Sequence, residues 1–103
     1  MKKRINELSI PKFNEEPRER WVLLFKGKVK RVAFRNEALL ISRKIGLVGY
    51  VKNTKQGVLV EVEGSLDKLN FFLEHIKSVK RFIITSYTLD KVKLKKEPRF
   101  IKK

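Results

Sequence analysis

The sequence contains no cysteine and one histidine, His75. Without cysteine the chain has no disulfide, no thiolate nucleophile and no cysteine ligands for zinc or an iron–sulfur cluster. A single histidine is also too little for a histidine-rich metal site or a Ser-His-Asp relay. We place His75 at the surface or boundary of a helix, where it acts as neither ligand nor base.

Long hydrophobic runs are also missing. The apolar runs at 22–25, 38–41 and 58–60 are far shorter than a membrane span, and the N-terminal residues do not resemble a secretory signal. We therefore expect a cytoplasmic protein with no membrane partner.

Acidic residues are scarce, with 11 Asp and Glu against 26 Lys and Arg, which gives a formal charge of +15. A field of this size attracts anions of every kind, from metabolite phosphates to nucleic acid. Many of the lysines fall in the stretch 91–103, a pattern typical of a solvated tail or edge. The alternative is that these lysines form a surface that binds nucleic acid.

The length of 103 residues suits one domain with a single core. Residues 1–19 mix charges with Pro11 and Pro17 and show no sustained period, which predicts a loosely ordered N-terminal extension. We expect the folded domain to span residues 20–103 and to be a monomer.

Within that domain the hydrophobic period alternates between strand and helix. Apolar residues recur at helical spacing after Phe34 and again after Ser65, the predicted N-cap of the second helix. The predicted order is a strand at 21–25, a helix at 34–45, strands at 47–53 and 58–63 joined by a turn at 54–57, a helix after Ser65, a strand at 80–89 and a short edge strand at 100–101. This is an α+β, ferredoxin-like split β-α-β sandwich with an antiparallel sheet of four to five strands and two helices on one face.

The transition from the first strand to the first helix is a candidate anion site. The first backbone N–H groups of a helix lack internal partners and favour negative charge. Arg35, expected in the first turn, adds a guanidinium that can hold two phosphoryl oxygens. Considered singly, Arg35 is also typical of a solvated helix start.

Two spaced blocks carry a resemblance to a known family. The first is Gly27-Lys28-Val29-Lys30-Arg31-Val32-Ala33-Phe34-Arg35, and the second is Ile45-Gly46-Leu47-Val48-Gly49-Tyr50-Val51-Lys52-Asn53, followed by Gly57. Their residues and intervals closely resemble the acylphosphatase family, whose pattern is approximately G-[RK]-V-Q-G-V-x-F-R and then L-G-L-x-G-x-V-x-N. The resemblance extends over about residues 20–103.

The resemblance implies hydrolysis of an acyl phosphate to a carboxylate and inorganic phosphate, without a metal or organic cofactor. It implies catalytic roles for Arg35, which would bind the phosphate, and for Asn53, which would hold the attacking water. The phosphate-binding loop would consist of the amides of Lys30, Arg31, Val32, Ala33 and Phe34. Asn53 alone is also typical of a turn at the end of a strand.

Two residues depart from the family pattern at the centre of the loop, because Arg31 replaces a glycine and Lys30 replaces a glutamine. If the loop needs a positive φ at the glycine position, arginine costs on the order of 1 kcal/mol there. Lys30 and Arg31 are either hydrogen-bond donors to the phosphate or simply exposed charges. Two functions therefore stay open: an acylphosphatase-like hydrolase, or a weak or inactive relative that binds nucleic acid or another polyanion through its basic surface.

Overall fold

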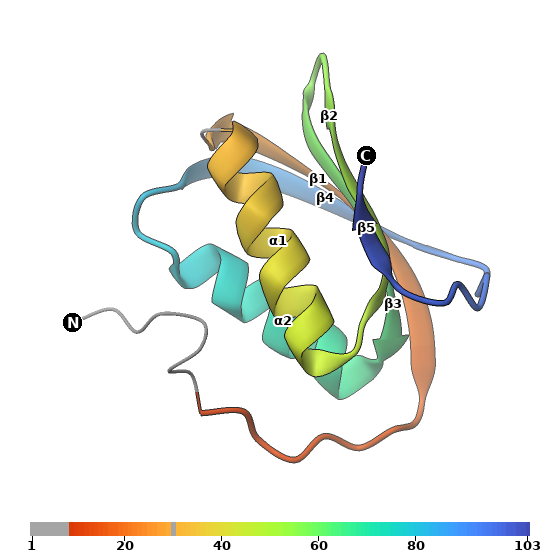
Figure 1. The fold of residues 1–103 in the computed structure, drawn as a ribbon. Coiled ribbons are helices and arrows are strands. Elements are labelled where there is room, and N and C mark those ends of the chain that lie inside the picture. Colours follow the sequence, from red (N-terminus) through yellow and green to blue (C-terminus); the bar gives the residue numbers. More distant parts are fainter. Residues whose placement is uncertain (1–8, 30) are drawn as a thin grey trace.

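The computed structural model describes residues 9–29 and 31–103, without the side chain of Arg31. Five strands form one sheet, and two helices cover one of its faces (Figure 1). The elements are β1 (Arg18–Lys28), α1 (Arg31–Ile45), β2 (Val48–Thr54), β3 (Gly57–Ser65), α2 (Leu66–Ser78), β4 (Ile83–Val92) and β5 (Phe100–Lys102). The split β-α-β order and the two helices on one face confirm the predicted fold class.

The strand order is β4-β1-β3-β2-β5. The neighbours β1/β3, β1/β4 and β2/β3 are antiparallel, but β5 runs parallel to β2, so the sheet is mixed and the prediction of an antiparallel sheet was wrong at this edge. The reason lies in the connection, because residues 93–99 cross the sheet from β4 before β5 begins at Phe100. A hairpin would have placed β5 beside β4 and antiparallel to it.

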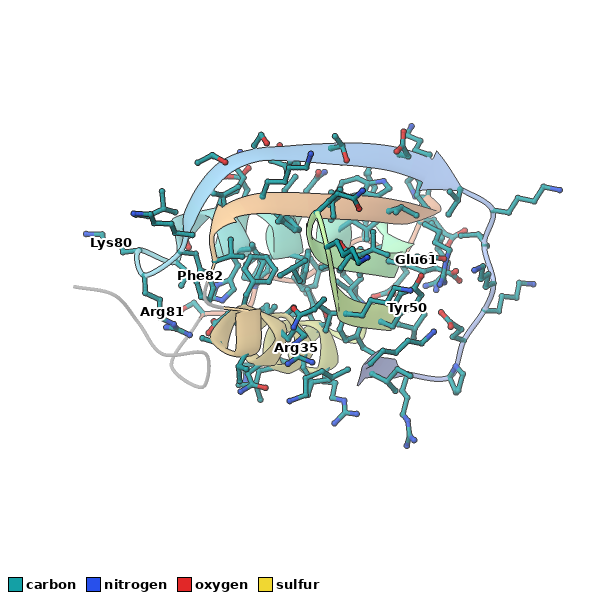
Figure 2. All side chains as sticks on the ribbon, turned by 90° about the horizontal axis from the view of Figure 1, so that it is seen from above. Arg35, Tyr50, Glu61, Lys80, Arg81 and Phe82 are labelled. Atoms are coloured by element: carbon teal, nitrogen blue, oxygen red, sulfur yellow. The ribbon has the colours of Figure 1, made fainter. Side chains whose placement is uncertain are left out.

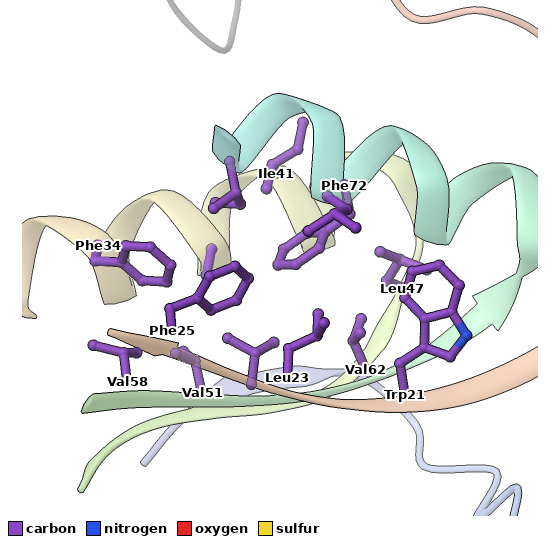
Figure 3. Close-up of a cluster of buried hydrophobic side chains, with 14 of the residues drawn as sticks. Trp21, Leu23, Phe25, Phe34, Ile41, Leu47, Val51, Val58, Val62 and Phe72 are labelled. Carbon is purple, nitrogen blue, oxygen red and sulfur yellow. The ribbon is translucent and has the colours of Figure 1, made fainter. Parts of the chain in front are cut away.

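Alternation along the strands produces one apolar face. Trp21, Leu23 and Phe25 of β1 pair with the valines of β3, and all of them are buried. The helices complete the core with the predicted stripes, seen in part in Figure 3. The buried helical side chains are Phe34, Ala38, Ile41 and Ile45 of α1 and Leu69, Phe72, Leu73 and Ile76 of α2.

Local signals in the sequence explain where the elements end. The side-chain oxygen of Ser65 accepts a hydrogen bond from the Lys68 backbone N–H, as expected of the N-cap of α2. The turn between β2 and β3 consists of Lys55 and Gln56, and the Thr54 hydroxyl accepts hydrogen bonds from the Gln56 and Gly57 backbone N–H groups. Both agree with the predicted cap and turn.

The segment before β1 touches the body of the protein. Phe13 is partly buried and meets Phe71 of α2 edge to face, with ring centroids 5.4 Å apart. The Asn14 backbone N–H donates to Asp67 over 2.9 Å. The division into an extension at 1–19 and a domain at 20–103 stays a prediction, and residues 1–8 lie outside the described part of the chain.

Candidate active site

The helix α1 begins at Arg31, earlier than the predicted start at Phe34. Its first four residues are therefore Arg31, Val32, Ala33 and Phe34, whose backbone N–H groups have no carbonyl one turn earlier in the helix. These are the loop amides proposed from the sequence, apart from that of Lys30, which lies outside the described residues. Because Arg31 is helical, a positive φ is not needed at this position.

Arg35 is the fifth residue of α1, so the prediction that it lies in the first turn was wrong by one residue. Its guanidinium donates from Nη1 to the Lys103 carbonyl oxygen over 3.3 Å. The Nε of Arg35 is buried and has no hydrogen-bond partner within the described part of the chain. Arg35 therefore has one N–H donor that no group in the described part of the chain uses.

Asn53 is exposed near the end of β2. It pairs with Val58 in the register, and it shares the helix-covered face of the sheet with Val51. Lys103 lies beside this strand, because its backbone N–H donates to the Val51 carbonyl oxygen over 2.8 Å. Lys103 thus contacts both Arg35 and the strand that carries Asn53, which brings the two predicted residues to the same end of the molecule.

The elements around this end carry almost no negative charge. The sequence has no Asp or Glu at 20–36, 38–60 or 98–103, so Glu37 is the one acid in α1. Glu37 turns away toward α2, where its carboxylate meets His75 Nε2 at 2.7 Å and Arg81 at 2.8 Å. The hydrogen bond to His75 lowers the pKa of Glu37, burial opposes this, and Arg81 lowers it further. The electrostatic field at the N-terminus of α1 is therefore positive.

The contact of Lys103 with Arg35 was not predicted from the sequence. Residues 91–103 were expected to form a solvated tail or edge, and His75 was expected at the surface or boundary of a helix, whereas it is buried against Glu37. Tyr50 belongs to the family pattern, and its hydroxyl contacts Glu61. Arg35 and Lys103 are 68 positions apart in the sequence, so no local sequence pattern indicates their contact. The side chains of Arg35 and Tyr50 can be followed in Figure 2.

The described residues contain no group of three or more His, Cys, Asp or Glu that could hold a metal ion. Neither of the described helices is long and apolar enough to cross a membrane. Metal independence, the monomeric state and the cytoplasmic location stay predictions.

Comparison with known proteins places these features in a family. The acylphosphatase family model matches residues 21–101. An acylphosphatase of Aliivibrio fischeri is 49% identical over 53 residues, which are 50% of this chain and 59% of the relative. An acylphosphatase of Synechococcus is 42% identical over 52 residues, which are 50% of this chain and 57% of the relative. The alignments thus span somewhat more than half of the length of these curated relatives.

Solved structures give the same assignment over a larger part of the chain. The acylphosphatase from Bacillus subtilis superposes with a TM-score of 0.74 at 27% identity, covering 81% of this chain and 96% of that one. Full-length HypF in a phosphate- and nucleotide-bound form has a TM-score of 0.78 at 26% identity, covering 84% of this chain and 12% of HypF. Because the family model matches most of the length of this chain, the chain belongs to the acylphosphatase family.

Proposed function

We propose that the protein hydrolyses acyl phosphates to a carboxylate and inorganic phosphate. The observation that carries the proposal is the position of Arg35 in α1, directly after the first-turn residues whose backbone N–H groups have no carbonyl one turn earlier in the helix. Donors fixed before the substrate arrives stabilise the charge of a phosphoryl group without reorganisation during the reaction. The family and the phosphate bound in the HypF structure support the same chemistry.

In this mechanism the amides of residues 30–34 and Arg35 bind the phosphoryl oxygens. The side-chain oxygen of Asn53 accepts a hydrogen bond from a water molecule. This hydrogen bond places the water oxygen in line with the phosphorus–oxygen bond to be broken. The water oxygen bonds to phosphorus and keeps its protons in the inorganic phosphate that forms, while the bond between phosphorus and the acyl oxygen breaks and its electron pair leaves on the carboxylate. The carboxylate leaves without protonation because the pKa of its conjugate acid is only about 4, well below neutral pH. A general acid is therefore unnecessary, in agreement with the shortage of histidine and cysteine.

The test is a benzoyl phosphate assay of the full chain beside four variants. Arg35→Ala and Asn53→Ala remove the two groups, and we expect each to lower kcat/KM by about 10²-fold or more. Arg35→Lys keeps the charge but loses the fork, and Asn53→Asp keeps the size but repels the phosphoryl group. We expect both of these variants to be as impaired as the alanine variants.

The assay also needs a control for general effects of charge. Lys44 lies in the last turn of α1, at the opposite end from the first-turn amides, and Lys44→Ala should retain full turnover. Activity that persists in EDTA would agree with metal independence. If the parent chain shows no turnover but binds RNA in a salt-sensitive manner, the hydrolase proposal fails and the polyanion-binding alternative replaces it.

A further inference from the structure

The face of the sheet opposite the helices carries a buried charge network. Arg20 of β1 is fully buried and pairs with Glu61, with Glu63 at 2.9 Å and with Glu97 at 2.7 Å. The backbone N–H groups of residues 95 and 96 donate to the Glu63 carboxylate over 2.8 and 3.1 Å. Glu97 and the backbone of residues 95 and 96 thereby connect the segment before β5 to the open face of the sheet.

Tyr50 of β2 connects this network to the candidate active site. Its hydroxyl donates to Glu61 Oε1 over 2.8 Å. The Nζ of Lys103 lies 3.9 Å from the centroid of the Tyr50 ring, a distance at which a cation and an aromatic face attract each other. Tyr50 is therefore anchored at its hydroxyl and holds Lys103 with its ring.

Lys103 in turn contacts Arg35. Its backbone N–H bonds to Val51, and its carbonyl oxygen accepts from Arg35 Nη1. An arginine side chain has many rotamers, and a fork that is fixed at its tip loses less entropy when it binds a phosphoryl group. Figure 2 labels the side chains of Glu61, Tyr50 and Arg35, which belong to β3, β2 and α1.

Burial alone would raise the pKa of Glu61, but hydrogen bonds from Arg20, Lys95 and Tyr50 outweigh burial and lower the pKa to about 2. The carboxylate of Glu61 is therefore charged at neutral pH and can accept the hydrogen bond of the Tyr50 hydroxyl there.

We propose that Tyr50 is a positioning residue that orients Arg35 through Lys103, with Glu61 as its anchor. The proposal rests on the hydrolase function proposed above, because Arg35 is the group that contacts the substrate there. Tyr50 itself is not a catalytic residue. The network on one face of the sheet thereby sets the geometry of a phosphate site at the other.

The kinetic test combines Tyr50 variants with the loss of Arg35. Tyr50→Leu removes the ring, and we expect kcat/KM for benzoyl phosphate to fall about 10-fold, whereas Tyr50→Phe should lower it about 3-fold because only the anchor is lost. In an Arg35→Ala background, Tyr50→Leu should change kcat/KM by less than about twofold, since residues acting through one group are not additive. An equal loss in both backgrounds would overturn the proposal.

Tyr87 supplies a matched control, because it lies on β4 with Lys77 near its ring at 5.8 Å and has no contact with Lys103 among the described interactions. Tyr87→Leu makes the same substitution at a tyrosine of another strand, and we expect it to leave kcat/KM unchanged. A loss equal to that of Tyr50→Leu would show a general effect on the sheet and would contradict the positioning role.

A second measurement separates this proposal from the hydrolase function. The Nε–H of Arg35 gives its own signal in a ¹H–¹⁵N NMR spectrum, assigned by its absence in Arg35→Ala, and it reports order whether or not the protein turns over substrate. We expect Tyr50→Leu to shift and broaden this signal, while Tyr87→Leu leaves it in place. An inactive parent chain would refute the hydrolase function alone, whereas an unchanged Arg35 signal in Tyr50→Leu would refute the positioning role alone.

Discussion

Gly49 of β2 adopts a φ of +131°, and a Cβ atom on it would overlap the carbonyl oxygen of Glu61 in the neighbouring strand. Gly46, just after α1, has a φ of +81°, but a Cβ there would meet only the end of the Lys68 side chain, at 3.5 Å. Both are glycines of the family pattern, and the structure separates their roles. Gly46 ends a helix, whereas Gly49 allows two strands to approach beside Tyr50.

We predict that Gly49→Ala lowers the free energy of unfolding by more than about 2 kcal/mol, because the backbone of β3 must move in addition to the strain at φ. Gly46→Ala should cost only about 1 kcal/mol, the strain of a left-handed residue alone. Urea unfolding of both variants at pH 7 measures the difference. Equal losses of unfolding free energy in the two variants would show that the overlap between the new Cβ atom at position 49 and the Glu61 carbonyl oxygen is relieved without cost.

At the scale of elements, α1 and α2 are joined by the buried contact between Glu37 and His75, which the sequence did not reveal. The helices, the Ser65 cap and the β2/β3 turn were predictable because their signals are local. The parallel β5 and the burial of Arg20 were not, because both depend on the path of residues 93–99 across the sheet. In the proposed site, Arg35 and Asn53 were predictable from the spaced family blocks, whereas the contacts of Lys103 with Arg35 and Tyr50 join segments far apart in the sequence.

We predict that Glu37→Gln lowers the free energy of unfolding at pH 7 by about 2 kcal/mol, because it leaves the charge of Arg81 and the ring of His75 with a weaker partner. Glu74→Gln on the exposed face of α2 is the control. Its pair with Lys77 is exposed at both side chains, and the loss should stay within about 0.5 kcal/mol. Thermal unfolding of both variants checks the contrast, and a similar effect at the two positions would refute it.

The charge network on the open face makes the stability of the whole molecule depend on pH. The pKa of Glu61 is about 2 in the folded protein, against 4.5 for a free carboxyl group. The unfolded chain therefore takes up the proton first as pH falls. The contribution of this group is complete above pH 4.5 and is lost as pH falls toward about 2. At 1.36 kcal/mol for each pKa unit its full size is about 3 kcal/mol.

We predict that Glu61→Gln is less stable than the parent chain at pH 7 and that the difference shrinks steadily between about pH 4.5 and 2. Urea unfolding at four pH values across this range measures the difference directly. Glu15→Gln is the control, because the Glu15 side chain is 70% exposed and its variant should track the parent chain at every pH. A gap between Glu61→Gln and the parent that stays constant at low pH would contradict the role of the charged carboxylate.

The charge of +15 and the candidate phosphate site make different predictions about added anions. Screening weakens repulsion between the many cations, so sodium chloride should raise the urea midpoint of the parent chain and of Arg35→Ala alike. Inorganic phosphate at equal ionic strength should stabilise the parent chain further, by RT ln(1 + [L]/Kd), because it binds the folded state. This extra stabilisation by binding should vanish in Arg35→Ala. Phosphate also stabilises proteins because it is excluded from their surface, and that effect would persist in Arg35→Ala. The same phosphate effect in both chains would mean that the charge of the whole molecule, not the mouth of α1, attracts the anion.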